Sequence, residues 1–396
     1  MSKPAVPIAE IYRQCHLQFA DRRALRDDRR GLTFGELGAQ ARRFGNALRD
    51  RGVADDARVV MVAPNSCDWV VADQGLALGG YTRVGVLPRL HASEVAQIAA
   101  DIDPSAVLVD AEWLAANGTD WIPPQVSEIV ILGDNAEIAE NHVRFEDFVA
   151  SGSEDELPDP DPESIVWVMY TSGSTGLPKG VLASQRSIGA MLRNGLKEVE
   201  FRADDIAVHT APVSHFTGSI HIAVGAVGGL NILKPGFEVG EVIEIASAGE
   251  VTVLPLVPTM ITMLIEELGR RGAPEGGIGA VRMIPYAGSA IQPDRAAKAR
   301  EFFGEVMTQF YGASEAPLPI TVLQPGDHVD VAKEGGLPRL ASAGRRAHYV
   351  GLEILDEEGK PLPAGETGEF RVSGEQVAPG DWRQPEASAE GCEDGS

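Results

Sequence analysis

Short apolar runs alternate with amphipathic stretches along the first third of the chain. Residues 59–62, 84–87 and 106–109 are mostly apolar runs of strand length, and residues 66–78 and 93–100 between them have the spacing of helices. Strands that alternate with helices of this length are typical of βαβ units. The pattern therefore predicts a largely parallel sheet for this part of the chain.

A second series of the same kind follows residues 151–163, an acidic and proline-rich stretch whose composition is typical of a solvated linker. The elements predicted for this series are strands at residues 165–169, 206–208, 251–254 and 281–286, and helices at about residues 185–197, 240–248, 259–270 and 293–303. From about Ser342 the pattern changes to short strands and turns, among them residues 352–355 and 369–372. A capping box at Thr33 and Glu36 predicts the start of a further helix.

Composition limits the class of protein. The 34 basic and 58 acidic residues give a formal charge of −24, which argues against a nucleic-acid binder and requires any phosphate site to act locally. The cysteines, Cys15, Cys67 and Cys392, form neither a disulfide framework nor a CxxC pair, so a reducing cytoplasm is expected. The sequence shows no signal peptide and no apolar stretch long enough to span a bilayer.

The strongest local signal is the stretch YTSGSTGLPKG at residues 170–180, in which an apolar run leads into glycines, hydroxyl residues and one lysine. Small residues let backbone N–H groups approach phosphate oxygens, while hydroxyls add donors and Lys179 adds a cation. Lys179 follows Pro178 and precedes Gly180, so the stretch is not a Walker A loop. Taken alone, such a stretch is more often a polar surface turn.

In these residues the chain resembles the signature loop of the adenylate-forming superfamily, which includes acyl- and aryl-CoA synthetases, peptide-synthetase adenylation domains and luciferases. Other segments resemble the motifs of that family in the same order along the chain: APVSHF at 211–216, YAGSA at 286–290, YGASE at 311–315 with serine in place of the threonine of YGxTE, and GETGE at 365–369. The resemblance covers nearly the whole chain. It implies an enzyme that joins a carboxylic acid to the AMP of ATP and releases pyrophosphate.

The resemblance also implies a role for each motif, with ATP and Mg²⁺ as cofactors. Residues that would bind the nucleotide are Thr171, Ser172, Gly173, Ser174, Thr175, Gly176 and Lys179 at the phosphates, and Gly288, Ser289, Ala290, Tyr311, Gly312 and Ser314 at adenine and the α-phosphate. Glu315, with Thr175, would hold the metal, and the catalytic residues would be Lys179, His215, Ser314 and Glu315. Fixed donors and a metal there would stabilise the charge that builds on the α-phosphate. Without the motif around it, Glu315 would be an ordinary solvated carboxylate.

The acid-binding pocket is expected beside His215, which without this context would be a structural histidine. The residues expected to bind the acid are His215, Phe216, Gly218, Gly288, Ser289 and Tyr311. No acidic residue occurs from residue 206 to 237, whereas relatives that activate amino acids need a carboxylate there for the ammonium group. The expected substrate is therefore a hydrophobic acid, either aryl or bulky alkyl.

The resemblance breaks off in residues 377–395, before the Thr-Gly-Asp block whose aspartate binds ribose in relatives. A hinge and a small C-terminal domain with a lysine that assists adenylation follow that block in the family. We expect the shortening to be natural. The chain would then perform the first half-reaction, and a partner protein would pass the acyl group to CoA; a homodimer is also considered.

The alternatives are a fragment of a complete acyl- or aryl-CoA synthetase and a non-catalytic protein of the same fold that binds ATP or an acyl-adenylate. A serine hydrolase is disfavoured, because residues 312–316 fall one residue short of a G-x-S-x-G elbow. The expected fold is layered α/β, with layers in the order αβαβα, two βαβ-type subdomains and a small β-barrel-like C-terminal lobe. The expected boundaries are residues 1–160, 161–340 and 341–396.

Overall fold

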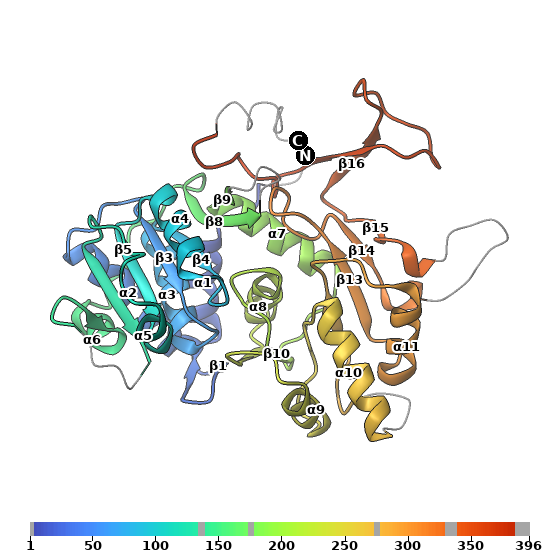
Figure 1. Ribbon diagram of the computed structural model, residues 1–396, viewed down its shortest axis with the longest axis horizontal. Helices are drawn as coiled ribbons and strands as arrows, with labels where there is room; N and C mark the ends of the chain where they lie inside the picture. The colour runs from blue at the N-terminus through green and yellow to red at the C-terminus, as the bar shows by residue number, and fades with distance from the viewer. Residues whose placement is uncertain (1–3, 134–138, 173–177, 273–277, 329–338, 385–396) are drawn as a thin grey trace. The chain divides into compact units, whose positions relative to one another are not determined.

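The computed structural model describes residues 4–133, 139–172, 178–272, 278–328 and 339–384 (Figure 1). These residues form two compact units. The first unit takes in the described residues of Met1–Ala190 and Ala378–Glu393, and the second those of Met191–Val377. The division of the chain into three parts at residues 160 and 340 stays a prediction.

The first unit is built on a seven-stranded sheet with the strand order β7-β6-β5-β3-β4-β8-β9. The strands are β3 Arg58–Val62, β4 Thr82–Val86, β5 Ala106–Asp110, β6 Glu128–Leu132, β7 Val143–Arg144, β8 Ile165–Ser172 and β9 Pro178–Ser184. All neighbouring strands pair in parallel except β8 and β9, which form an antiparallel hairpin. This arrangement confirms the predicted βαβ series, because buried parallel strands have the continuous apolar runs seen in the sequence.

Helices connect these strands and bury their apolar faces. The helices of the first unit are α1 Ile8–Gln18, α2 Phe34–Asp50, α3 Cys67–Gly79, α4 Ala92–Ile102, α5 Ala111–Asn117 and α6 Phe145–Ser151, together with the first part of α7 Gln185–Glu198. The predicted capping box starts α2: the Glu36 N–H donates to Thr33 Oγ1 at 3.2 Å, and the Thr33 N–H donates to Glu36 Oε2 at 2.8 Å. Val95 and Ile98 of α4 pack on Val60 and Val107 of the sheet.

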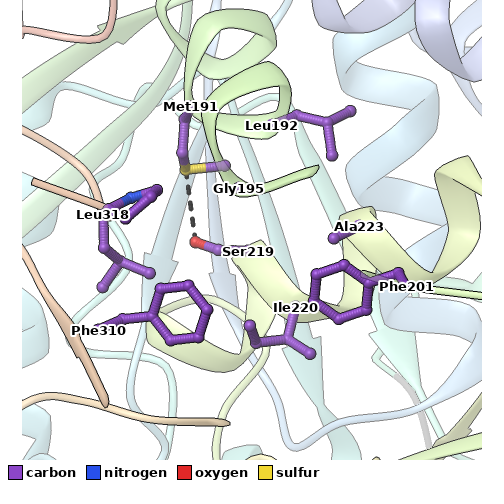
Figure 2. A pocket seen from close by; sticks show the side chains of 10 residues that line it. Met191, Leu192, Gly195, Phe201, Ser219, Ile220, Ala223, Phe310 and Leu318 are labelled. Carbon is purple, nitrogen blue, oxygen red and sulfur yellow. Dashed lines mark hydrogen bonds between the residues drawn. The ribbon is translucent and has the colours of Figure 1, made fainter. Parts of the chain in front are cut away.

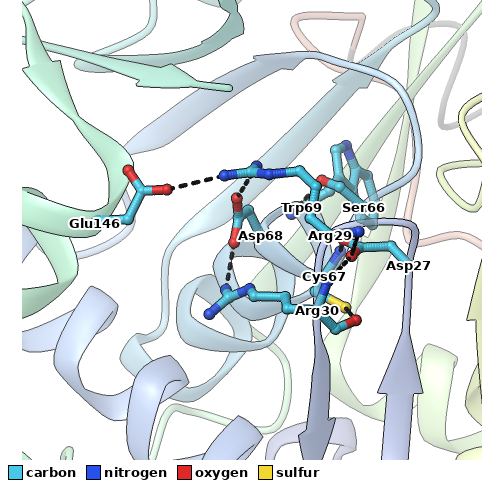
Figure 3. Close-up of polar contacts among 8 residues, drawn as sticks. All are labelled: Asp27, Arg29, Arg30, Ser66, Cys67, Asp68, Trp69 and Glu146. Carbon is cyan, nitrogen blue, oxygen red and sulfur yellow. Dashed lines mark hydrogen bonds and ion pairs between the residues drawn. The ribbon is translucent and has the colours of Figure 1, made fainter. Parts of the chain in front are cut away.

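A short antiparallel hairpin, β1 Arg23–Arg26 and β2 Gly31–Thr33, is fixed to the start of α3 by charged side chains (Figure 3). Asp27 accepts hydrogen bonds from the N–H groups of Arg29, Arg30 and Cys67 at 2.7–2.9 Å. The buried carboxylate of Asp68, which is 1% exposed, is paired with both arginines. Because a buried carboxylate needs such partners, these arginines are occupied by a structural role.

Residues 151–163 do not form the solvated linker that their composition predicts. The Asn46 Nδ2 group on α2 donates to the carbonyl oxygens of Ser153 and Asp155 at 3.0 and 2.9 Å, and Leu157 is only 5% exposed. The strand that follows, β8, belongs to the first sheet rather than to a second series. The acidic composition reflects an exposed outer side on a segment whose inner side packs on α2.

The second unit contains a parallel pair and a mixed four-stranded sheet. Its strands are β10 Ile206–His209, β11 Leu230–Leu233, β12 Ile284–Tyr286, β13 Met307–Tyr311, β14 Thr321–Leu323 and β15 Arg345–Arg346. Strand β10 pairs in parallel with β11 and β12 with β13, whereas β13–β14 and β14–β15 are antiparallel. Its helices are α8 Phe216–Ala226, α9 Val239–Ser247, α10 Pro258–Arg271 and α11 Pro293–Phe303, with 3₁₀ turns at Pro325–Asp327 and Arg339–Ala341.

Two predictions for this unit need correction or remain open. The expected strand at residues 251–254 is not a strand; Val253 makes only isolated bridges to Ala207 and Met283. Strands β16 Gly351–Leu355 and β17 Glu369–Ser373 form a two-stranded antiparallel sheet, as the strand pattern predicts, but a barrel-like lobe is not confirmed. Within the described residues, no helix has the length and apolar character that crossing a bilayer requires.

Candidate functional site

The glycine- and hydroxyl-rich stretch connects β8 to β9 in the first unit. Thr171 pairs with Lys179 and Ser172 with Pro178 at the open end of the hairpin. Gly173, Ser174, Thr175 and Gly176 lie outside the described residues. The Lys179 side chain is half-buried, and it has no ion-pair partner among the residues that the structure describes. The two ends of the predicted phosphate loop are thus held side by side by a regular ladder.

Residues near the end of the described chain support this hairpin. The Trp382 N–H donates to the Gly180 carbonyl at 2.7 Å, and the Leu182 N–H donates to the Gly380 carbonyl at 3.0 Å. A Cβ at Gly180 would lie 2.8 Å from Val168 and 3.2 Å from Trp382, so only glycine permits this packing. No local pattern predicts this support, because residues 375–396 show no periodicity.

Tyr170, the first residue of the signature stretch, is held in place by residues outside the loop. Its hydroxyl donates to the carboxylate of Asp101, and the Trp382 indole N–H donates to the Asp101 carbonyl at 3.1 Å. Burial, reinforced by that carboxylate, raises the pKa of the Tyr170 phenol. Tyr170 is therefore a neutral anchor of the hairpin.

In the second unit, a tight turn presents His215 at the N-terminus of α8. The Thr217 hydroxyl contacts the carbonyls of Ala211 and Pro212 at 3.0 Å each, which closes the turn. A Cβ at Gly218 would lie 2.1 Å from the Val213 carbonyl oxygen, so the first turn of α8 requires glycine. The His215 side chain is exposed, and its Nδ1 lies 2.8 Å from the Ser214 hydroxyl.

The YAGSA segment follows β12 in the same unit. Tyr286 is fully buried, with its hydroxyl 3.0 Å from both Gln309 Oε1 and His328 Nε2. Gly288 has a φ of +93°, a conformation that favours glycine, and Ser289 next to it is exposed, as is Ala290. The buried tyrosine thus fixes the strand end from which three exposed small residues project.

The YGASE segment follows β13, the parallel neighbour of β12. Parallel strands deliver the residues after their carboxyl ends to one edge of the sheet, which is where ligands bind in open α/β sheets. The structure therefore brings Gly288 and Ser289 to the same sheet edge as Tyr311. The Tyr311 ring, 36% exposed, meets Phe370 of β17 edge to face at 6.0 Å. Phe370 was not predicted as a site residue.

The loop that joins β13 to β14, residues 312–320, is tightly folded. A Cβ at Gly312 would lie 2.7 Å from the Leu318 nitrogen, so the two arms of the loop touch there. The Ala313 N–H donates to the Ala316 carbonyl at 3.1 Å. Ser314 is half-buried and Glu315 is exposed. The loop therefore presents the predicted metal carboxylate on a short, well-connected piece of backbone.

An apolar pocket lies within the second unit (Figure 2). Its lining comes from α7, α8, β13 and the loops after α7 and β13: Met191, Leu192, Gly195, Phe201, Ser219, Ile220, Ala223, Phe310, Leu318 and Pro319. It encloses about 280 Å³ including space open to solvent, of which only about 10 Å³ admits the centre of a water molecule. The pocket is thus narrow, and no lining side chain is charged.

The residues predicted to bind the acid are not among those that line this pocket. They are their neighbours in sequence: Gly218 precedes the lining residue Ser219, and Tyr311 follows the lining residue Phe310. The Ser219 hydroxyl is within hydrogen-bonding distance of the Met191 sulfur, at 3.4 Å, so the polar atom in the wall already has a contact. The roles of the predicted residues stay predictions.

The residue expected from the sequence to hold Mg²⁺ on the described part of the chain is Glu315. Across the described ranges, no group of three or more histidine, cysteine, aspartate or glutamate side chains could hold a metal ion. Mg²⁺ is commonly bound through one or two carboxylates together with substrate phosphates. The exposed carboxylate of Glu315 fits that manner of binding, in which the nucleotide itself supplies ligands.

The motifs, the sheet edge and the apolar pocket define a protein of the adenylate-forming class. The chain belongs to the AMP-binding enzyme family, whose profile matches residues 12–382. It is 28% identical to a medium/long-chain-fatty-acid–CoA ligase, FadD8 of Mycobacterium tuberculosis, over 92% of this chain and 63% of that protein. It is 29% identical to a feruloyl-CoA synthase of an Amycolatopsis species, over 94% of this chain and 71% of that protein.

The fold is that of a solved N-terminal domain. The inhibitor-bound crystal structure of the N-terminal domain of FACL13 from Mycobacterium tuberculosis superimposes with a TM-score of 0.84 and 22% identity. The match covers 98% of this chain and 94% of that domain. The chain thus spans roughly two thirds of the length of the two ligases, 63% and 71%, and nearly all of the solved domain.

Proposed function

We propose that this chain activates a hydrophobic carboxylic acid by adenylation, forming an acyl-AMP and pyrophosphate from ATP. The observation that carries the proposal is in the second unit: the YAGSA and YGASE segments leave one edge of the β12–β13 pair, and Phe310 on β13 lines an apolar pocket. Family membership and the likeness to ligases of fatty and aromatic acids support it.

The chain's own residues would act on the nucleotide through charge and hydrogen bonds. Thr171 and the loop that follows would wrap the β,γ-phosphates, with Lys179 supplying a cation. Tyr311 would lie against adenine, and the Ser314 hydroxyl would donate to the α-phosphate. Glu315, together with Thr175, would hold Mg²⁺, which when bound neutralises charge that develops on the phosphate oxygens.

The substrate class follows from the pocket. An ammonium group placed among Phe201, Ile220 and Phe310 would be a buried charge without a carboxylate partner, which costs several kcal/mol. An apolar chain or ring gains free energy by leaving water for the same surroundings. We therefore propose fatty or aryl acids as substrates and exclude free amino acids.

We further propose that the chain performs the first half-reaction and that a partner protein passes the acyl group to CoA. The residues assigned above all serve adenylation. A fragment of a complete acyl- or aryl-CoA synthetase, or a protein that binds ATP or acyl-adenylate without turnover, remains the alternative. Comparing CoA ester formation with pyrophosphate release by the purified chain tests the half-reaction, and pyrophosphate release itself separates adenylation from binding without turnover.

The test is pyrophosphate release over a panel of fatty, aryl and amino acids, with ATP and Mg²⁺. Glu315→Gln keeps the size of the side chain but removes its charge, and should lower the rate about 10²–10³-fold, as loss of a preorganised electrostatic group does. Glu357→Gln, an exposed carboxylate in the turn after β16, is the matched control and should leave the rate unchanged. Full activity of a folded Glu315→Gln protein would remove Glu315 from the mechanism. Binding of ATP and acid without pyrophosphate would favour the non-catalytic alternative.

A further inference from the structure

Two buried amide side chains hold the loop that carries Ser314 and Glu315. Asn194, near the end of α7, is 0% exposed, and Gln376, after β17, is 2% exposed. The Asn194 Nδ2 group donates to the Pro319 carbonyl at 3.0 Å and to Gln376 Oε1 at 2.8 Å. The Gln376 Nε2 group donates to the Pro317 carbonyl and, at 3.1 Å, to the Pro319 carbonyl. We call this pair the amide clamp.

The carbonyls give these amides one orientation. If either amide were rotated by half a turn, its oxygen would face another oxygen and the buried carbonyls would lose their donors. Asn194 Oδ1 is also used, because the Tyr349 N–H donates to it at 3.4 Å. The clamp thus uses the donors and acceptors of both side chains.

The residues beside the clamp tie the same two segments together. Arg193, next to Asn194, forms an ion pair with Glu375, next to Gln376, at 2.5 Å. Its guanidinium lies over the Tyr349 ring, 4.6 Å from the ring centroid. Beside the clamp, the Arg193–Glu375 ion pair therefore joins α7 to the segment after β17 a second time.

The bound carbonyls lie at a position that matters for the site. Pro317 and Pro319 flank Leu318, whose side chain and that of Pro319 line the apolar pocket, and Glu315 lies two residues before Pro317. Because proline has no backbone N–H group, residues 317–319 cannot pair as a regular β-strand. The side chains of Asn194 and Gln376 supply the hydrogen bonds that the backbone does not.

We propose that Asn194 and Gln376 are positioning residues that set the β13–β14 loop, and with it both the pocket wall and the carboxylate of Glu315. This inference rests on the proposed function for its consequence in catalysis. Its structural part, the placement of residues 312–320, can be measured without turnover.

The test compares replacements that differ only in their ability to donate hydrogen bonds. Gln376→Met has similar length and no donor at any pH, whereas Gln376→Glu can donate only when its carboxyl is protonated. Asn194→Asp makes the second change at the other member of the clamp. Gln324→Met is the matched control. Gln324 Nε2 also donates to a partly buried backbone carbonyl of this unit, that of Glu198, but makes no such bond to the loop.

Hydrogen exchange reports on the loop itself. The amides of Ala313 and Ile320 are bonded across it, to the carbonyls of Ala316 and Tyr311. In Gln376→Met these two amides should exchange roughly tenfold faster or more, the effect of losing donors to buried carbonyls, while Gln324→Met leaves them unchanged. Unchanged exchange at both amides in a folded Gln376→Met protein would overturn the proposal.

Kinetics report on the consequence. Pyrophosphate release by Gln376→Met should fall roughly tenfold or more and need a higher Mg²⁺ concentration, because Glu315 is displaced. Gln376→Glu should approach the wild-type rate, measured at the same pH, as pH falls and its carboxyl gains a proton. If Gln376→Met fails to fold, Gln376→Glu and Asn194→Asp carry both measurements.

The two levels of the argument fail separately. If the wild-type chain releases no pyrophosphate with any acid, the proposed function fails and hydrogen exchange still decides on the clamp. If the wild type is active and the Gln376 and Asn194 variants match Gln324→Met in rate, Mg²⁺ requirement and exchange, the clamp proposal fails and the proposed function is untouched.

Discussion

Replacing Gly218 by alanine should destabilise the turn that presents His215, whereas the same replacement of Gly225, two turns further along α8, should stabilise the protein. An added Cβ at Gly218 would lie 2.1 Å from the Val213 carbonyl oxygen. At Gly225 the nearest atom to an added Cβ would be Asn231 Nδ2 at 3.9 Å, an ordinary contact. The same substitution is thus compared at two positions of one helix, one with a close backbone contact and one without.

The magnitudes follow from two opposing effects. Alanine in a helix interior is favoured over glycine by about 0.8–1.0 kcal/mol; Gly225 is the second-to-last residue of α8, so this figure is the upper limit of the gain there, and no close contact opposes it. At Gly218 the distance from the new Cβ to the Val213 oxygen must increase by about 0.9 Å before the contact is tolerable, and overpacking of this kind typically costs about 1–3 kcal/mol. The net loss at Gly218 is then up to about 2 kcal/mol.

Thermal unfolding measures both effects. For a unit of this size, 1 kcal/mol shifts Tm by roughly 2–4 °C, so Gly225→Ala should raise Tm by up to that much and Gly218→Ala should lower it by up to about 8 °C. Pyrophosphate release should show a raised KM for the acid in Gly218→Ala only, because the turn before α8 moves with His215. Equal Tm shifts in the two variants, or a Gly218→Ala protein as stable as the wild type, would refute the close contact on which this reasoning depends.

Other predictions concern the pocket and the response to acid. Phe310→Leu should widen the pocket and lower the KM of bulky aryl acids relative to short acids, at a stability cost below the about 3–5 kcal/mol typical of Phe→Ala; an unchanged ranking of acids would separate Phe310 from substrate choice. Burial lowers the pKa of His16 and of His209 to about 4 and that of His221 to about 3, each from 6.5. The unfolded chain protonates these histidines near pH 6.5, whereas the folded chain keeps them neutral to a lower pH. The free energy of unfolding is therefore highest above pH 6.5. It falls as pH decreases toward 4, by about 1.4 kcal/mol per histidine per pH unit. Tm should therefore be clearly lower at pH 5 than at pH 7.5, and less so in His209→Asn; a pH-independent Tm would contradict the burial of these rings.

The elements that were predicted well from the sequence have local signals that mark where they begin and end. Helix α10 begins with a proline in its first turn and ends at Gly272, whose φ is +65°, and α11 also begins with a proline. Strands β3 and β5 are apolar runs between helices. Helix α8 had no such signal, because it is buried on nearly every side and so lacks the polar face that makes a helix amphipathic.

The site shows the same division. Ser289 and Glu315, which the motifs singled out, lie exposed on loops at strand ends, and each motif is continuous in sequence; their roles stay predictions. The supporting contacts join distant residues: the Trp382 indole reaches the Asp101 carbonyl across 281 positions, and Gln376 reaches the Pro319 carbonyl across 57. A sequence pattern reports on residues that are close together along the chain, so it holds no information on such long-range contacts. Neither hydrogen bond was predicted.

The β13–β14 loop links the two halves of the proposed chemistry. One short segment carries Glu315 at its exposed tip and places Leu318 against the pocket. Gly312 packs on the backbone of Leu318, so the arm that bears the carboxylate and the arm that lines the pocket cannot move independently. The pocket admits little in its present form, so an acid that enters must displace wall atoms such as those of Leu318. Under the proposed function, such a displacement would move Glu315, and linkage would then require that metal–nucleotide binding and acid binding alter each other by the same factor. Coupling between the two substrates is therefore expected if the proposed function holds, because both proposed sites would be built on one tightly folded loop.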